Sequence, residues 1–221
     1  MIKLTNICKN YRGEDFDIPA LSDINLEVKE SEFVAIMGKS GSGKSTLLSI
    51  IGGLEKADSG DCMVDDMEIG KYTPLKLDLY RRDKIAFVFQ NFALIEDYTV
   101  YENVAVPLDA IKMGSAEKRR RISDRLNLLG IEKYKKKYPR QLSGGEKQRV
   151  AIARALVKDC PYLLADEPTG ALDQFNSQII MEYLKKANEA GKTIIVVTHD
   201  SDVAPYADRI VYLSNGKIES D

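Results

Sequence analysis

The segment from Gly38 to Ser45 reads GKSGSGKS and matches in full the pattern GxxxxGK followed by Ser or Thr. Glycines at these positions allow backbone N–H groups to turn inward around phosphate oxygens, where side chains would clash. We expect Lys44 to reach the β- and γ-phosphates and the Ser45 hydroxyl to hold Mg²⁺. The alternative is a flexible glycine-serine turn, which the position between an apolar run and a helical pattern disfavours. The segment therefore predicts an ATP-binding loop.

Two adjacent carboxylates, Asp166 and Glu167, follow the apolar run YLLA. Such a pair at the end of a buried strand is costly unless a cation occupies the space between the groups. We expect Asp166 to hold Mg²⁺ and Glu167 to accept a proton from an attacking water or to orient it. The alternative is a strand-end turn into Pro168, and the phosphate loop makes this reading weaker.

Three further side chains are candidate site residues because of their positions in the sequence. His199 is the only histidine and follows the run TIIVVT, so we expect its imidazole to bind the γ-phosphate and couple it to Glu167. Gln90 follows KIAFVF, and its amide can ligate Mg²⁺ or the water without adding charge. Tyr11 can stack on an adenine ring, although it can equally be one surface tyrosine among eleven.

Short apolar runs precede each of these polar positions. Such runs are typical of strands buried on both faces of a parallel sheet, and helical patterns follow two of them directly. This alternation predicts an α/β layered fold with ligands at the carboxyl ends of the strands. The expected strands are residues 32–37, 84–89, 162–165 and 193–197, and the two helices are residues 44–51 and 174–190.

The middle of the chain, from Tyr98 to Lys137, is charged and mostly helical in pattern. Residues 116–129 predict one helix, which ends at Gly130. The basic run from Lys118 to Arg121 has acidic neighbours and indicates a solvated helix face more than a nucleic-acid site. We interpret this region as a helical lobe inserted into the sheet domain.

Composition limits the remaining possibilities. The 221 residues are 44% hydrophobic and 30% charged, so the chain can bury a core, and a net charge of -2 gives no reason to expect a nucleic-acid partner. Cys8, Cys62 and Cys160 have no metal-ligand spacing and are expected to be reduced thiols. Neither a signal peptide nor a membrane-spanning run is expected, so a partner would have to bring the chain to a membrane.

The segment LSGGE, from Leu142 to Glu146, opens a helical pattern about twenty residues before Asp166. It resembles the signature motif of ABC ATPases, and the other family motifs occur in order along nearly the whole chain. These are Tyr11, the phosphate loop, Gln90, the signature, Asp166–Glu167, Ala171–Leu172–Asp173 and His199.

The resemblance implies a P-loop NTPase (RecA-like) core sheet with an inserted α-helical subdomain and an N-terminal antiparallel β portion. It implies a single ABC ATPase domain over residues 1–221, with the core at 1–90 and 160–221 and the helical subdomain at about 91–159. It also implies an ATP hydrolase that dimerises in the presence of ATP, because the signature of one subunit contacts the γ-phosphate bound by the other. The intact signature and Asp166–Glu167 pair favour a homodimer over pairing with a relative.

The expected site follows residue by residue. ATP contacts within one chain are expected from Tyr11, Gly38, Ser40, Gly41, Ser42, Gly43, Lys44, Ser45 and Thr46. Contacts across the dimer are expected from Ser143, Gly144, Gly145 and Asp173. Mg²⁺ ligands are expected to be Ser45, Gln90 and Asp166, and the catalytic residues Glu167, His199 and Gln90.

A narrower resemblance concerns residues 90–108 and 168–173, which look like the lipoprotein-release, macrolide-export and bacitracin-resistance branch of the family. That branch implies a partner permease with few membrane helices and a large extracytoplasmic domain, at the cytoplasmic face of a membrane, bacterial by expectation. The aromatic and aliphatic segment 91–106 is the expected groove for a cytoplasmic helix of this permease.

Two other functions compete with a transporter motor. A soluble ABC ATPase of DNA repair or chromosome structure would need sustained heptads between Ser45 and Leu142, which are absent, and translation factors carry two such domains. A small-molecule kinase would not explain LSGGE. The sequence favours the transporter motor.

Overall fold

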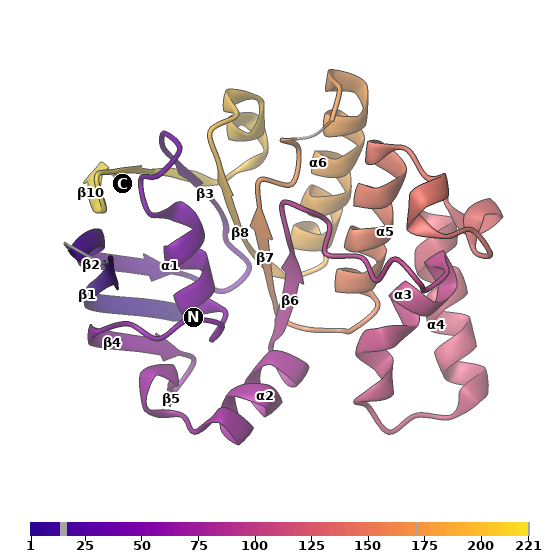
Figure 1. Ribbon diagram of the computed structural model, residues 1–221, viewed down its shortest axis with the longest axis horizontal. Helices are drawn as coiled ribbons and strands as arrows, with labels where there is room; N and C mark the ends of the chain where they lie inside the picture. The colour runs from indigo at the N-terminus through magenta and orange to yellow at the C-terminus, as the bar shows by residue number, and fades with distance from the viewer. Residues whose placement is uncertain (14–16, 171, 221) are drawn as a thin grey trace.

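The computed structural model describes residues 1–13, 17–170 and 172–220. Its centre is a six-stranded sheet of order β10-β9-β3-β8-β7-β6 (Figure 1). All neighbouring strands from β9 to β6 are parallel, and β10 is antiparallel to β9. The strands are β3 (Phe33–Met37), β6 (Ile85–Val88), β7 (Tyr162–Asp166), β8 (Thr193–Thr198), β9 (Arg209–Ser214) and β10 (Lys217–Ser220).

The inner strands are apolar on both faces because each face has its own core. In β8, Ile194 and Val196 belong to the core shared with the helices around α5. Ile195 and Val197, between them, belong to the core shared with the antiparallel sheet and α1. Period-two alternation therefore divides a continuous apolar run between two hydrophobic layers. The four strands expected from the sequence are confirmed, with ends that differ by at most one residue.

Six α-helices surround the sheet in the described residues. They are α1 (Lys44–Ile51), α2 (Pro74–Asp83), α3 (Val100–Asp109), α4 (Ser115–Leu128), α5 (Gly144–Leu156) and α6 (Gln174–Glu189). Four 3₁₀ segments connect them, η1 (Ile69–Lys71), η2 (Glu132–Tyr134), η3 (Pro139–Gln141) and η4 (Ser201–Tyr206). The predicted helices are confirmed, and Gly130, just after α4, has the positive φ of 66° that a helix C-terminus favours.

A second, four-stranded antiparallel sheet of order β2-β1-β4-β5 lies beside α1. It is built from β1 (Ile2–Arg12), β2 (Asp17–Val28), β4 (Ser59–Val64) and β5 (Met67–Glu68). In Figure 1 this sheet lies at the left, the six-stranded sheet runs from β10 at the left to β6 near the middle, and α3, α4 and α5 lie at the right. This arrangement agrees with the antiparallel portion and the helical lobe that the family resemblance implied.

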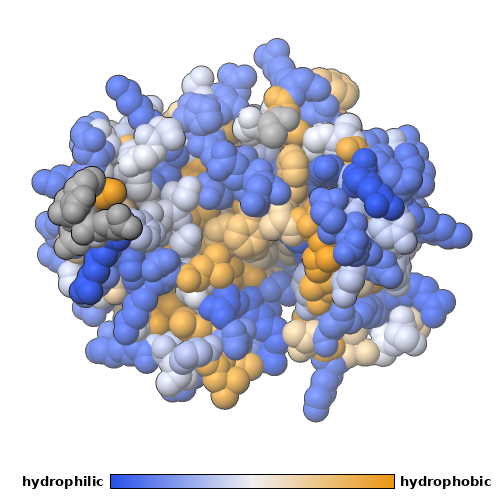
Figure 2. Space-filling model, in the orientation of Figure 1, coloured by the Kyte–Doolittle hydropathy of each residue, from blue (hydrophilic) through white to orange (hydrophobic). Residues whose placement is uncertain are grey.

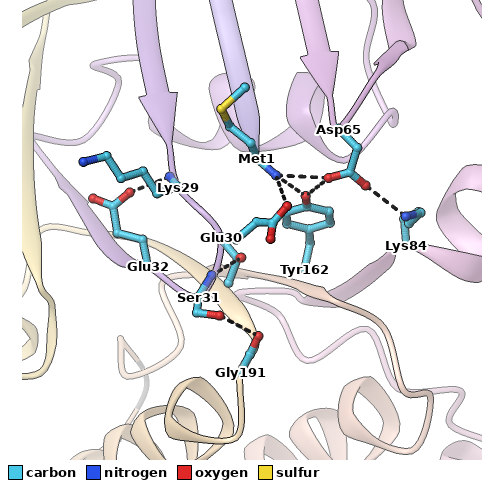
Figure 3. Close-up of polar contacts among 10 residues, drawn as sticks. Met1, Lys29, Glu30, Ser31, Glu32, Asp65, Lys84, Tyr162 and Gly191 are labelled. Atoms are coloured by element: carbon cyan, nitrogen blue, oxygen red, sulfur yellow. Dashed lines mark hydrogen bonds and ion pairs between the residues drawn. The ribbon is translucent and has the colours of Figure 1, made fainter.

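Polar contacts join the two sheets at the end opposite the phosphate loop. Asp65, in the turn between β4 and β5, accepts hydrogen bonds from the Tyr162 hydroxyl, the Lys84 ammonium at 2.9 Å and the Met1 amino group at 3.0 Å (Figure 3). Tyr162 begins β7 and Lys84 directly precedes β6. One carboxylate thus fixes the small sheet against two strands of the large one.

The described part of the chain contains no helix that is both long and apolar enough to span a membrane. All three cysteines are unpaired, as expected, and Cys62 and Cys160 are buried.

Candidate functional site

The phosphate loop connects β3 to α1 at the carboxyl edge of the large sheet. Its backbone leaves no room for side chains at two positions. A Cβ on Gly38 would lie 2.1 Å from the carbonyl oxygen of Leu213, and a Cβ on Gly43 would lie 2.4 Å from that of Ala20. Gly43 also has a φ of 103°, which L-residues rarely adopt. The glycines predicted from the motif are therefore required by the fold itself.

The turn between β9 and β10 braces this loop from the side. Gly216 N–H donates to the Ser42 carbonyl at 3.0 Å, and the Gly216 carbonyl accepts from Ser22 N–H at 2.8 Å. One residue thus connects the phosphate loop, the C-terminal hairpin and the antiparallel sheet. The loop's shape depends on residues far apart in the sequence.

Lys44 is buried, and its ammonium points back into the loop. It donates to the carbonyls of Gly38 at 2.8 Å and Lys39 at 3.0 Å, and it lies 3.9 Å from Oε1 of Glu167. The Ser42 hydroxyl is buried beside it with no hydrogen-bond partner among the described residues. A buried cation and an unsatisfied donor at the mouth of a backbone cradle fit a phosphate group.

Ser45 and Asp166 face each other across the site, with Ser45 Oγ donating to Oδ1 of Asp166 at 3.0 Å. Burial, together with the neighbouring charge of Glu167, raises the pKa of Asp166, although Ser45 and Lys44 oppose the shift. A hydroxyl and a carboxylate are hard oxygen ligands, and a divalent cation would offset the cost of holding two carboxylates here. The donor set fits Mg²⁺.

Glu167 has both carboxylate oxygens engaged at the end of β7. Oε2 accepts from the Thr198 hydroxyl at 2.9 Å, and Oε1 lies 2.9 Å from Nδ1 of His199. Its backbone is in the left-handed region, with a φ of 44°, and its N–H donates to Val197 at 2.9 Å. A strained non-glycine backbone of this kind persists only when its surroundings hold it. Glu167 is buried, whereas the His199 side chain is 64% exposed and therefore open to a ligand.

The signature residues form the start of α5. Ser143 caps the helix, accepting from Glu146 N–H at 3.3 Å, and Glu146 accepts from Ser143 N–H at 2.8 Å. A Cβ on Gly145 would lie 2.9 Å from the side chain of Asn176, whose own backbone N–H donates to Asp173 at 2.8 Å. The structure thus places Gly145 and Asp173, both expected to act on the partner's nucleotide, on the two sides of one asparagine.

The remaining predicted residues lie around the edge of this site. The Tyr11 hydroxyl is 3.3 Å from Oγ1 of Thr46 in α1, which places an exposed ring next to the phosphate loop. Gln90 lies two residues beyond β6 and is exposed. Among the described contacts, none joins Gln90 or Ser143 to Glu167. Ala171, in the predicted loop before α6, lies outside the described residues.

Sequence reasoning missed two supporting residues. Thr198 holds one oxygen of Glu167, and its only sequence signal is a hydroxyl at the end of an apolar strand, directly before His199. Gln148, buried in α5, donates to the Pro168 carbonyl at 2.8 Å and so connects the signature helix to the turn after Glu167.

Comparison with known proteins covers the whole chain. A family model described as ABC transporter matches residues 21–170. The uncharacterised ABC transporter ATP-binding protein MJ0796 of Methanocaldococcus jannaschii is 48% identical over 100% of this chain and 96% of its own length. The macrolide export ATP-binding/permease protein MacB of Campylobacter fetus is 44% identical, and this chain spans 34% of it. A solved dimeric structure of the ATP-binding cassette MJ0796, in a post-hydrolysis state with ADP and Pi, has a TM-score of 0.95 at 47% identity and covers 100% of this chain and 97% of that one.

Proposed function

The chain belongs to the ABC transporter family, as an ATP-hydrolysing subunit, and we propose that it powers a separate membrane permease. The observation that carries the coupling to a permease is an apolar groove beside Gln90. Hydrolysis itself is assigned to the cluster of Lys44, Glu167 and His199.

The geometry supports a distinct role for each member of this cluster. Backbone N–H groups from Gly41 to Thr46, with Lys44, neutralise the phosphates of ATP. Glu167 takes the proton of the attacking water, and His199 holds the γ-phosphate in line with it. Thr198 and His199 together fix the carboxylate of Glu167, so its orientation is set before ATP arrives.

Mg²⁺, held by Ser45, Asp166 and Gln90, would neutralise charge that develops on the phosphates. The hydrogen bond from Ser45 to Asp166 keeps these two ligands side by side. Gln90, exposed two residues beyond β6, is the ligand that can leave when its loop moves.

Two copies of the chain are proposed to enclose two ATP molecules. Ser143, Gly144 and Gly145 lie at the N-terminus of α5, where helix geometry favours an anion. In this arrangement they bind the γ-phosphate held by the partner copy, with Asp173 close to the same interface. The dimeric MJ0796 cassette, similar over the whole chain, supports a dimer of this kind.

The apolar groove, about 310 Å³ in volume, lies where β6, α3 and the loop after Gln90 meet. Its apolar lining includes Leu54, Phe87, Phe89, Val106 and Pro107. Figure 2 shows apolar surface gathered across the middle of this face. A groove of this size and chemistry fits a short amphipathic helix of a permease.

We further propose that the permease is of the branch with few membrane helices and a large extracytoplasmic domain, which holds the chain at the cytoplasmic face of the membrane. MacB, whose name joins ATP-binding and permease functions, supports this placement. The division into a core at residues 1–90 and 160–221 and a helical subdomain at about 91–159 is part of the same proposal.

Affinity purification from gently solubilised membranes tests the proposal. We expect the tagged wild-type chain to recover a polytopic membrane protein stoichiometrically, and Leu54→Asp to lose it. Leu128→Asp is a matched control, because Leu128 is on α4 outside the groove and both leucines are 46% exposed. Recovery only from the soluble fraction, with ribosomes or DNA factors, would favour a soluble ABC ATPase instead.

A further inference from the structure

The loop after Gln90 contains two consecutive strained residues. Phe92 has a φ of 61° and Ala93 a φ of 48°, so both lie in the left-handed region although neither is glycine. This conformation is unfavourable for residues other than glycine and persists only where other contacts hold it. Something outside the loop must therefore impose its shape.

One side chain makes the contacts that do so. The guanidinium of Arg154, in α5, donates to the Ala93 carbonyl at 2.5 Å and to the Phe92 carbonyl at 2.7 Å. Burial lowers the pKa of Arg154, and among the described residues no ion pair joins it to a carboxylate. The guanidinium therefore rests on the carbonyls of the strained pair, which its planar fork can engage together.

A second cation, just beyond the end of α5, contacts the other end of β6. Lys158, four residues after Arg154, donates to the carbonyls of Arg81 at 2.9 Å, Arg82 at 3.3 Å and Ile85 at 2.9 Å. β6 is the edge strand of the large sheet. Lys158 thus holds the chain where β6 begins, and Arg154 holds it just after β6 ends.

The same helix begins at the signature. Ser143 caps α5, and about eleven residues of helix, roughly 16 Å, separate it from Arg154. A rigid helix transmits displacement along its length. Movement of the signature when it closes over the partner's phosphate would reach Phe92 and Ala93 through Arg154.

We propose that Arg154 is a positioning residue that ties the loop of Gln90 to the signature helix, so that the Mg²⁺ ligand and the signature move as one unit. Arg154 touches neither ATP nor the reacting atoms. The inference rests on the proposed role of Gln90 in the site. It explains why a strained loop is kept in contact with a half-buried cation beside the proposed permease groove.

Hydrogen–deuterium exchange by mass spectrometry, together with ATPase kinetics, tests the proposal on the full chain. Arg154→Met keeps the aliphatic bulk and removes the donors, whereas Arg154→Lys keeps one charge without the bidentate fork. Lys158→Met is the matched control for loss of a half-buried cation that also binds backbone carbonyls beside β6.

We expect Arg154→Met to raise exchange in residues 89–98 about tenfold while residues 144–156 keep their protection. We expect kcat to fall about fivefold with little change in KM for ATP, because binding by the phosphate loop is untouched. Arg154→Lys should have loop exchange and a kcat between those of wild type and Arg154→Met. Lys158→Met should raise exchange in residues 81–86 and not in residues 89–98.

Wild-type exchange in residues 89–98 of Arg154→Met would overturn the clamp, as would exchange that rises equally over the whole chain. Faster loop exchange with an unchanged kcat would overturn the link to Gln90. Exchange and ATPase kinetics need no permease. A negative result here would therefore overturn the role of Arg154 without affecting the proposed coupling to a permease.

Discussion

Oε1 of Glu167 lies 2.9 Å from Nδ1 of His199, in a chain with no other histidine. The two side chains come from neighbouring strands, β7 and β8, which end at the same edge of the sheet. The pairing leaves His199 exposed toward the site while Glu167 is buried. The proposed general base and the proposed phosphate contact are thereby fixed against each other.

The first prediction is that Glu167→Gln retains ATP binding but loses turnover by about 10²–10⁴-fold, because the amide cannot accept the water's proton. ATP should then accumulate between two copies, and light scattering in Mg-ATP should show a dimer. Glu182→Gln, an exposed change on α6, is the control and should turn over like wild type. A Glu167→Gln protein that hydrolyses ATP at the wild-type rate would remove Glu167 from the mechanism.

The second prediction separates the two groups that hold Glu167. His199→Ala should bind ATP and turn over poorly, because a phosphate contact is lost together with the carboxylate's partner. Thr198→Val keeps the shape and removes the hydroxyl, which donates to Oε2 and accepts from Asp200 N–H at 3.0 Å, so its kcat should fall about tenfold or less. Steady-state kinetics with both variants measures the difference. If Thr198→Val lowered kcat more than His199→Ala did, Thr198 would contribute more to turnover than His199.

The third prediction concerns Lys44. Lys44→Ala should weaken ATP binding about 10- to 100-fold, since charge-assisted hydrogen bonds to phosphate are lost. Isothermal titration calorimetry measures it directly. Lys39→Ala removes an exposed charge from the same loop and should cost much less affinity. Equal affinity in wild type and Lys44→Ala would contradict the assignment of the loop.

The fourth prediction is a gain of stability at the cost of function. The raised pKa of Asp166 means that folding disfavours its charged form, so this group destabilises the protein at pH values above the carboxyl's ordinary pKa. Asp166→Asn should therefore raise the free energy of unfolding at pH 7 without Mg²⁺. Mg²⁺ should stabilise the wild type and not the variant. Urea unfolding with and without Mg²⁺ checks both signs.

The fifth prediction is a loss of stability in acid through Asp65. Burial alone would raise its pKa, but hydrogen bonds from Tyr162, Lys84 and the Met1 amino group outweigh burial and lower the pKa to about 2. A lowered carboxyl pKa stabilises the fold above the ordinary value of 3.8, and the contribution is lost as the pH falls toward 2. Allowing for solvent screening, it is on the order of 1 kcal/mol at pH 7.

Asp65→Asn should thus be less stable than wild type at pH 7, and the gap should close between pH 4 and pH 2. Chemical denaturation across this range measures the gap. A difference that does not vary with pH would show that the carboxylate's charge contributes nothing.

The sequence predicted the parts of the fold whose signal is local. β3 and β8 are continuous apolar runs, so burial on both faces could be read from them directly. The sequence pattern did not predict β1, because register shifts after Leu4 and Ile7 interrupt the alternation of apolar and polar residues. α2 is short and polar, and six of its ten residues are exposed, so no apolar stripe marks it.

The site residues also divide into those with a local signal in the sequence and those without one. Lys44, Ser45, Asp166 and Glu167 lie in contiguous motifs, and the structure brings them together. Arg154 has partners about sixty residues away that are backbone carbonyls, and a carbonyl leaves no mark in a sequence. Contacts of this kind become visible only when the fold is known.

The hydrogen bond from Gly216 to Ser42 has a consequence for the order in which the chain is made. The phosphate loop emerges from the ribosome early, whereas the hairpin that braces it follows long after, at about 5–20 residues per second. For roughly ten seconds or more a nascent chain carries the complete GKSGSGKS motif without its brace. We therefore expect the phosphate loop to take its final shape only once β9 and β10 have joined the sheet.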